Sequence, residues 1–300
     1  MNTRRFFITA VVLFLLLVAF RSEVYAQNAQ LTGIITDDNS ALIAGARLTL
    51  INVNTNVTHN TVTNKDGYYS IPFVPPGNYQ LKVFADGFRP LTRNNLSINV
   101  DQAARIDFTL EIGTLNESVN ISTNEPPLER DTSSIGQVIE NKTIVTLPLN
   151  GRNYSQLVLL MPGATPNQLP RATDGFSVNG NRALQNKFLM DGLDNNNYIT
   201  GVDTGSTQVI RPSVDAIQEF KVESANYSAR YGQAAGGIIS VALKSGTNSF
   251  HGSAFEFLRN DALDANDFFA NRAGLERGQL RFNQFGGTLG GPVWRNRTFF

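Results

Sequence analysis

The chain has 300 residues, of which 41% are hydrophobic and 17% charged, and its 25 Lys and Arg residues balance its 25 Asp and Glu residues. A net charge of zero gives no electrostatic reason to expect nucleic acid or an anionic surface as a partner. The absence of cysteine excludes disulfides, thiolate metal sites and a cysteine nucleophile.

The N-terminus has the order of a secretory signal. Arg4 and Arg5 precede an apolar run over residues 6–20, and small residues follow up to Ala26. This order predicts a signal peptide over residues 1–26, cleaved near Ala26. The run is shorter than the about 20 apolar residues of a spanning helix. A membrane-embedded part of this protein is therefore expected to be a β-barrel.

Residues 28–112 contain seven short strand-like runs separated by turn residues, and the clearest alternation covers Arg105–Glu111. Such a series predicts a β-sandwich. Tyr69 and Tyr79 fall on the faces that are expected to form the core, so core packing is favoured over stacking on a sugar. No catalytic or metal-ligand constellation accompanies these runs.

Three stretches of this domain resemble the carboxypeptidase regulatory-like family: Thr63–Ile71, Pro75–Leu81 and Gly87-Phe88. The resemblance implies a transthyretin-like sandwich with a carbohydrate-binding-like fold. Fold analogy alone assigns no activity to it. A secreted or surface β-sandwich that binds carbohydrate or protein is accordingly the alternative function for the chain.

Residues 113–127 are polar and end in Pro-Pro, which predicts a linker. The linker contains a strand-capable segment, Glu117–Ile121, and an additional strand of the sandwich is an equally open interpretation of it.

Residues 128–246 mix short helix and strand signals and predict an α+β domain. The loop Leu147–Asn153 precedes an apolar run at near-helical spacing, Tyr154–Met161, which ends at Pro162-Gly163. Glycine-flanked strand segments follow around residues 176–182 and 188–194, and Ile217–Glu223 is the last strand before the junction with the next part.

The stretch Tyr227–Asn260 carries two alternating strand patterns. In the second pattern Phe255 and Phe257 share one face and Glu256 lies on the other. Aromatic residues facing lipid and a charge facing a polar lumen are typical of an outer-membrane strand. A soluble hairpin with one wet face is the alternative.

Segments of this stretch resemble the junction between plug and barrel in TonB-dependent outer-membrane receptors of the Oar-like subgroup. They are Tyr231–Val241, Lys244–Asn248 and His251–Ser253. The resemblance implies a mainly β protein with a plug over residues 128–246 and the start of an outer-membrane β-barrel over residues 247–300. Because plugged barrels have about 22 strands, we expect the native chain to be longer.

The resemblance also implies a function. The protein would be a transporter in the cell outer membrane, embedded in outer-membrane lipid, with its sandwich in the periplasm. It would import an unknown substrate, such as a carbohydrate or peptide, without enzymatic chemistry, cofactor or metal. Its partner would be a TonB-type periplasmic energy transducer, which captures an extended strand. The corresponding TonB-box-like residues are Glu117, Ser118, Val119, Asn120 and Ile121.

Two further groups of residues are predicted by position in the plug. The plug motif consists of Asn179, Gly180, Arg182, Asp191 and Gly192. The candidate substrate loop consists of Asp194, Asn195, Asn196 and Tyr198, for which a solvated Asx-rich turn is the favoured alternative. Arginines are expected to pair the plug with the barrel, with the candidates Arg152, Arg182, Arg211 and Arg230.

Overall fold

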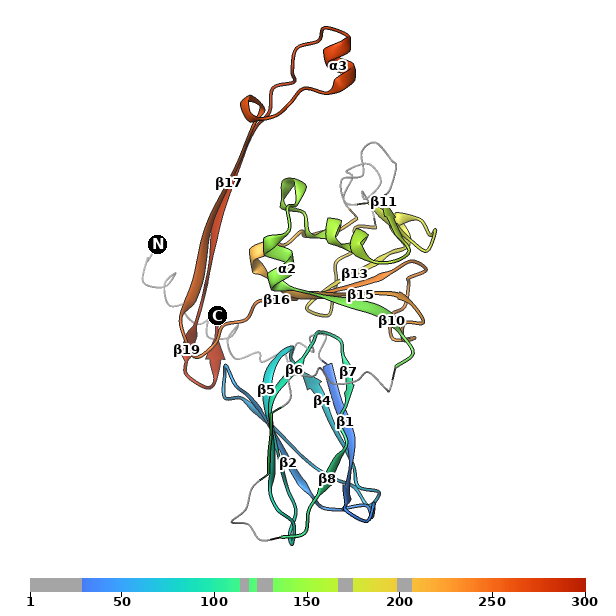
Figure 1. Cartoon of the computed structure of the whole chain (residues 1–300), viewed down its shortest axis with the longest axis vertical. Coiled ribbons are helices and arrows are strands. Elements are labelled where there is room, and N and C mark those ends of the chain that lie inside the picture. Colours follow the sequence, from blue (N-terminus) through green and yellow to red (C-terminus); the bar gives the residue numbers. More distant parts are fainter. Residues whose placement is uncertain (1–28, 114–118, 123–131, 167–174, 199–206) are drawn as a thin grey trace, which may run out of the picture.

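The computed structural model describes residues 29–113, 119–122, 132–166, 175–198 and 207–300, so the predicted signal peptide lies outside the described residues. A β-sandwich lies at one end of the molecule, a central domain built on one mixed sheet lies next to it, and a long hairpin stands beside the central domain (Figure 1). No helix among the described residues is long and apolar enough to cross a membrane.

The sandwich consists of two sheets around one hydrophobic core, as the alternation over residues 28–112 predicts. In the first sheet β1 (Ala29–Asp37) lies between β4 (Tyr68–Val74) and β7 (Ala103–Arg105), and it also pairs with β8 (Phe108–Leu110). The second sheet has the order β3 (Thr58–Val62), β2 (Arg47–Asn52), β5 (Gly77–Phe84), β6 (Leu91–Ile98) and β9 (Val119–Ser122).

Tyr69 and Tyr79 are buried in this core, as predicted. The Tyr69 hydroxyl donates to the carbonyl oxygen of Ile106 (2.7 Å), and burial raises the pKa of that phenol above its ordinary value. Gly33 makes this packing possible, because a Cβ on it would lie 1.9 Å from the same Ile106 oxygen. Neither tyrosine ring is therefore available to a sugar.

Phe73 departs from the alternation that Tyr69 and Ile71 begin along β4. The pattern places Phe73 on the inner face, yet its side chain is 55% exposed while Val74 is fully buried. Phe73 has a left-handed backbone (φ 57°), and the pairing of β1 with β4 shifts register next to it. This bulge turns Val74 into the core in place of Phe73.

The central domain has a five-stranded sheet in the order β10 (Ile135–Glu140), β15 (Ile217–Ala225), β16 (Ile238–Leu243), β13 (Lys187–Met190) and β14 (Leu193–Asp194). A separate ladder joins β11 (Ala164–Pro166) to β12 (Phe176–Val178). Its described residues include the helix α2 (Asn141–Thr146) and the 3-10 helices η1 (Asn150–Arg152), η2 (Tyr154–Leu160), η3 (Ala183–Gln185) and η4 (Val214–Ala216).

The two faces of this sheet differ in character. Phe220, Val222 and Val241 belong to the apolar core on the face that α2 and η2 cover, and Tyr154 packs edge-on against Phe220 with 5.4 Å between ring centroids. The helical spacing over Tyr154–Met161 thus yields a 3-10 helix. The opposite face of the sheet is turned toward the sandwich (Figure 1).

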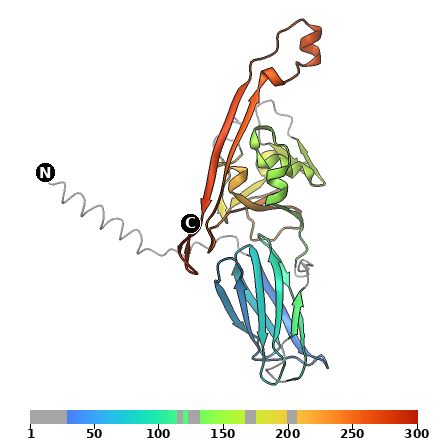
Figure 2. The same ribbon diagram turned by 60° about the vertical axis from the view of Figure 1, so that its left-hand side comes forward.

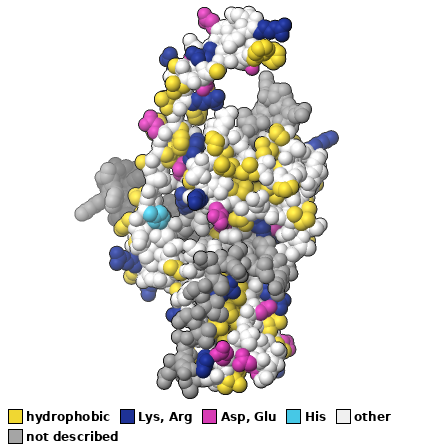
Figure 3. Space-filling view, in the orientation of Figure 1, with side chains coloured by type: hydrophobic (Ala, Val, Ile, Leu, Met, Phe, Trp, Pro, Cys, Tyr) yellow, Lys and Arg dark blue, Asp and Glu magenta, His cyan; other side chains and the backbone are white. Residues whose placement is uncertain are grey.

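The hairpin consists of β17 (His251–Asn260) and β18 (Arg281–Gly290), paired without a register shift from His251 opposite Gly290 to Asn260 opposite Arg281. Figure 2 shows it rising beside the central domain and extending beyond it. The far connection contains η5 (Asp261–Leu263) and α3 (Phe268–Arg272), and the short pair β19 (Pro292–Trp294) and β20 (Thr298–Phe299) follows β18. Hydrophobic side chains are visible along the hairpin in Figure 3.

Candidate functional site

The loop between α2 and η2 is the place where the central domain contacts the hairpin. Gly151 and Arg152 have left-handed backbones (φ 64° and 53°), which turn the chain sharply. Gln156 braces the turn, because its side chain accepts from the Asn150 N–H (3.1 Å) and donates to the Asn150 carbonyl (2.9 Å). The loop therefore presents Asn150 and Arg152 to the hairpin from a braced backbone.

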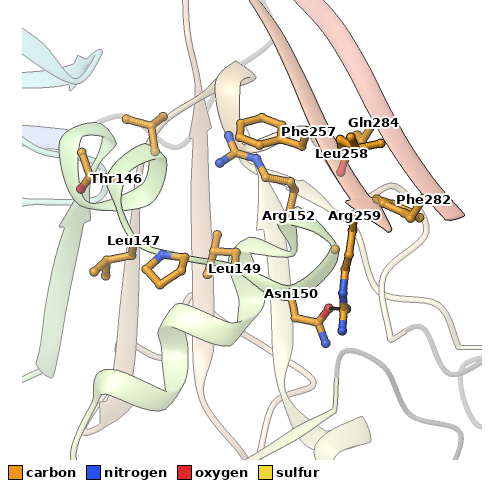
Figure 4. Close-up of a pocket in the computed structure, with 13 residues that line it drawn as sticks. Thr146, Leu147, Leu149, Asn150, Arg152, Phe257, Leu258, Arg259, Phe282 and Gln284 are labelled. Atoms are coloured by element: carbon orange, nitrogen blue, oxygen red, sulfur yellow. Dashed lines mark hydrogen bonds between the residues drawn. The ribbon is translucent and has the colours of Figure 1, made fainter. Parts of the chain in front are cut away.

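Arg152 makes two contacts at once. Its Nη2 donates to Asp215 Oδ2 (3.0 Å), and both side chains are largely buried. Its guanidinium also lies over the Phe257 ring, with 3.9 Å to the ring centroid (Figure 4). Arginine suits this position because a planar guanidinium stacks and donates hydrogen bonds simultaneously.

A cavity of about 570 Å³ lies between this loop and the hairpin. Its walls combine apolar side chains such as Leu149 and Phe282 with the polar side chain of Gln284 (Figure 4). At its margin Arg259 Nη1 donates to Asn150 Oδ1 (2.8 Å). Among the described residues, the Arg259–Asn150 hydrogen bond and the Arg152–Phe257 ring contact thus bridge the two parts around an open space. We therefore expect that they separate without exposing a large packed apolar area.

The sandwich contacts the central domain through its tip, residues 98–102. Glu219, Lys221 and Glu223 alternate along β15, so they share the face opposite to Phe220, and all three are buried. The Val100 N–H donates a short hydrogen bond to Glu219 Oε1. Lys221 Nζ donates to the Asp101 carbonyl oxygen (3.1 Å). Charged groups of one domain are therefore held by the main chain of the other.

Burial raises the pKa of Glu219 to about 7; the hydrogen bond from Val100 opposes this rise and the nearby Glu140 adds to it. Lys221 Nζ lies 3.2 Å from Glu223 Oε1, and Arg230 forms an ion pair with Asp101 of the tip. Sequence reasoning missed this cluster. The alternation of charged and apolar residues over Ile217–Glu223 was its signal.

Three family models match the chain in the order of its three parts. Residues 30–111 match a carboxypeptidase regulatory-like domain, residues 129–238 a TonB-dependent receptor plug domain, and residues 242–300 an outer membrane beta barrel domain. The chain belongs to the TonB-dependent receptors. The central domain is accordingly the receptor plug, and the hairpin belongs to the barrel domain.

The chain is 26% identical over 294 residues to the TonB-dependent transporter Oar of Myxococcus xanthus, a match that covers 94% of the chain and 27% of that protein. It is similar to the siderophore receptor PirA of Acinetobacter baumannii, with 24% identity, a TM-score of 0.41, and coverage of 56% of this chain and 24% of that one. It is also similar to the outer membrane transporter YddB of Escherichia coli, with 17% identity and a TM-score of 0.41. That match covers 52% of this chain and 24% of the other one. The chain thus spans about a quarter of the length of its curated relative.

The hairpin of this receptor presents its aromatic face to the plug. Sequence analysis expects Phe255 and Phe257 to face lipid and Glu256 to face the lumen, but Arg152 of the plug lies on Phe257. Since side chains alternate along a strand, Glu256 lies on the face away from the plug, opposite Phe285 of β18. The predicted alternation is confirmed, but the predicted orientation is wrong, because Phe257 faces the plug and Glu256 faces away from it.

The first part of the receptor's predicted plug motif lies at a turn after β12. Asn179 and Gly180 have left-handed backbones (φ 52° and 78°), and Asn179 Nδ2 donates to the Ser224 carbonyl oxygen (2.9 Å). Arg182 begins η3 and its side chain is exposed. These residues shape the plug, and none of them contacts the hairpin through a recorded hydrogen bond or ion pair among the described residues.

Asp191 and Gly192 form the two-residue turn between β13 and β14. Both have left-handed backbones (φ 45° and 83°), as the type I′ hairpin turn requires. Asp191 Oδ1 also accepts from the Leu243 N–H (3.0 Å), which ties the turn to the end of β16. The Asp-Gly pair therefore fixes the position of the candidate substrate loop that follows it.

Asn195 and Asn196 of the candidate substrate loop are buried and point inward. Asn196 Oδ1 accepts from the Phe188 N–H (2.8 Å), and Asn195 Oδ1 accepts from the Ile210 N–H (2.9 Å). Their amide groups replace missing main-chain partners beside β13. Their burial corrects the expectation of a solvated turn, and contact of these two residues with a substrate stays a prediction.

Asp194 and Tyr198 lie together at the surface of the plug. Lys187 donates to Asp194 and, at 3.0 Å, to the Tyr198 hydroxyl. Burial alone would lower the pKa of Lys187 and raise that of Asp194, but their hydrogen bonds and mutual attraction reverse both shifts. Contact with a substrate remains a prediction for Asp194 and Tyr198. The described residues contain no group of three or more potential metal-ligating side chains.

The TonB-box-like segment is only partly described. Glu117 and Ser118 lie outside the described residues, whereas Val119, Asn120 and Ile121 belong to β9. β9 pairs in parallel with β6, from Leu91 opposite Val119 onward. Of the interpretations that the sequence left open for this segment, the additional sandwich strand is confirmed for Val119–Ser122, which forms the fifth strand of the second sheet. Its role as a TonB box stays a prediction.

Proposed function

We propose that this chain is part of a TonB-dependent transporter of the outer membrane, in which movement of the plug opens the barrel to a substrate. The contact between the plug loop and the hairpin carries the proposal. Arg152 reaches Phe257, and Asn150 reaches Arg259, across a cavity that apolar packing does not fill. Such a contact seats a plug and still lets it move, and the transport cycle involves no bond chemistry in the chain.

The arrangement of the parts supports one orientation. The sandwich lies near the His251 end of the hairpin, and the connection over residues 261–280 lies at the far end (Figures 1 and 2). Outer-membrane barrels have short periplasmic turns and longer extracellular loops. We therefore place the sandwich in the periplasm, after export through the signal peptide, and the far connection outside the cell.

The energy transducer is the proposed partner. A TonB-type protein would add the extended segment Glu117–Ile121 to the edge of its own sheet, and main-chain hydrogen bonds would give this capture its affinity. Since Val119–Ser122 already pairs with β6, capture requires that the segment leave the sandwich.

The conductance and cross-linking tests use the full-length protein and need no knowledge of the substrate, whereas the uptake test follows once a substrate is known. Reconstituted in a planar lipid bilayer, the wild type should be closed, and a variant without residues 129–238 should form a large, steady pore. A thiol cross-linker on Asn120→Cys should capture the transducer in intact cells, and deletion of Glu117–Ile121 should abolish uptake while the protein stays in the outer membrane. A plug-deleted variant that conducts no better than the wild type would contradict a plugged barrel.

A further inference from the structure

One face of the plug sheet is buried although it carries charged side chains, as a solvent-exposed face would. Glu219, Lys221 and Glu223 are 7%, 3% and 3% exposed, although they alternate with the fully buried core residues Phe220 and Val222. Charged residues are depleted from the centres of protein interfaces, because each ion loses its hydration there. A permanent contact between two domains at this position would be expected to carry apolar side chains.

The sandwich compensates these charges incompletely. Val100 donates its N–H to Glu219, and the Asp101 carbonyl oxygen accepts from Lys221. Within the described part of the chain, Glu223 Oε2 and Ser240 Oγ are buried without a protein hydrogen-bond partner. Buried polar groups of this kind gain hydrogen bonds when an interface opens to water.

The tip brings the apolar side chain of Val100 to this contact. Val100 is 1% exposed, yet it is not a member of the sandwich core, so the plug and its surroundings bury it. Beyond the tip, the Gln218 side chain donates a long hydrogen bond to the Pro76 carbonyl oxygen (3.4 Å). The sandwich thus holds the plug mainly through one tip and one charged strand.

We propose that the sandwich is a releasable cap on the plug, whose tip docks on Glu219, Lys221 and Glu223 and leaves when that face becomes solvated. Release would free β15, which is the central connection between β10 and β16 in the plug sheet. The regulatory role of this release rests on the proposed transport function. The docking equilibrium itself does not.

Protonation of Glu219 gives the cap a measurable signature. The charged groups around it are Glu140 on β10, Lys221 and Glu223 on its own strand, and Asp101 with its partner Arg230 at the tip. Because burial raises the pKa of Glu219 from 4.5 to about 7 in the docked state, docking is strongest at low pH and weakens as the pH rises from about 4.5 through 7. Between pH 5 and 8 the docking constant should fall on the order of tenfold to a hundredfold.

A thiol at the tip reports release. In the full-length protein, with Val100→Cys as its sole reactive thiol, the rate of maleimide labelling is measured from pH 5 to 8 and divided by that of Asp38→Cys, an exposed site on the same sandwich. Ile98→Cys, inside the sandwich core, controls for unfolding. The ratio for Val100→Cys should rise with pH, while Ile98→Cys stays protected throughout.

The Glu219→Gln variant distinguishes release of the sandwich caused by ionisation of Glu219 from other effects of pH. The amide keeps an acceptor for the Val100 N–H and has no charge to desolvate, so Val100→Cys should stay protected at pH 8 in this background. Protection equal to that of Ile98→Cys at every pH in the wild type would mean a permanent interface, and labelling equal to that of Asp38→Cys at pH 5 would mean no docking. Either result overturns the cap. If the protein shows the pH dependence but does not transport, the releasable cap is supported and the proposed transport function is contradicted.

Discussion

Arg152 joins two parts of the receptor, the plug and the hairpin, through one guanidinium. It donates to Asp215 Oδ2 at 3.0 Å and lies 3.9 Å from the centroid of the Phe257 ring on the hairpin. The braced turn at Gly151 fixes the backbone position of Arg152, and the Phe257 ring fixes the position of its guanidinium group. The position of the plug against the wall should therefore respond to Arg152 more than to other plug arginines.

Replacing Arg152 by Ala should loosen the plug strongly. The substitution leaves the Asp215 carboxylate buried without its partner, and breaking a buried pair in this way costs about 3–5 kcal/mol. Arg152→Lys keeps the charge but loses the planar stack, so its effect should be intermediate. Denaturant titration of the full-length protein, followed by protease accessibility of the plug, measures both. The exposed Arg182→Ala is the matched control and should change stability by less than about 0.5 kcal/mol.

A disulfide between β6 and β9 should block capture by the transducer. Thr92 pairs with Asn120 in the ladder, and paired positions fall within the Cα separation that a disulfide spans. The double variant Thr92→Cys/Asn120→Cys should therefore oxidise readily, and binding of the transducer's periplasmic domain should return on reduction. Thr49→Cys/Asn60→Cys on β2 and β3 is the control, since locking that pair should leave capture unchanged. Undiminished capture by the oxidised β6–β9 variant would show that β9 is not the captured segment.

At position 258, the outer face of the hairpin should tolerate an apolar residue far better than a positive charge. Leu258 is 63% exposed and alternates with Phe257, so it points away from the plug toward the proposed lipid. Leu258→Arg should destabilise the inserted barrel by about 2–4 kcal/mol, whereas Leu258→Phe should be nearly neutral. Heat-modified mobility of the full-length protein in membrane extracts, measured over a temperature series, distinguishes the two variants. Equal melting of both would place this face away from lipid.

The candidate substrate loop should divide into a structural and a functional half. Asn196→Ala leaves the buried Phe188 N–H without an acceptor, so it should lower plug stability by about 1–3 kcal/mol. Asp194→Asn leaves the main chain of the loop unchanged but removes the charged partner of the largely buried Lys187, so it should keep the fold at some cost in stability and alter uptake once a substrate is known. The pKa of Asp194 is lowered in the folded protein, so its stabilising pair with Lys187 is present above the ordinary carboxyl pKa and is lost as the pH falls through the lowered value. Unfolding curves of both variants at pH 7 and pH 3 test this division.

Local alternation allowed much of the architecture to be predicted. Leu48 and Leu50 of β2, and Tyr69 and Tyr79 of the neighbouring strands, are buried because every second residue of a half-buried strand faces the core. These features depend on a few neighbouring residues, which is why one sequence was enough.

Features that depend on a distant partner were not predictable in this way. The alternation of Phe257 with Glu256 defines two faces, and only the position of Arg152 decides which of them meets the plug. Asn195 and Asn196 have the composition of a wet turn, yet main-chain groups at Phe188 and Ile210 draw them inward. The buried environment of Glu219 depends on Val100, which is far away in the sequence and donates its N–H to the carboxylate.

The parallel pairing of β9 with β6 has a mechanical consequence. Both strands run toward the tip that meets the plug, since β6 ends at Ile98 and residues 98–102 follow it. A pull along the strand axis loads the paired positions, from Leu91–Val119 to Asn94–Ser122, in shear, so they must fail together. A sideways pull breaks them one after another, like a zipper. The direction from which the transducer draws on the segment therefore decides whether the strand peels off at low force or drags the whole sandwich with it.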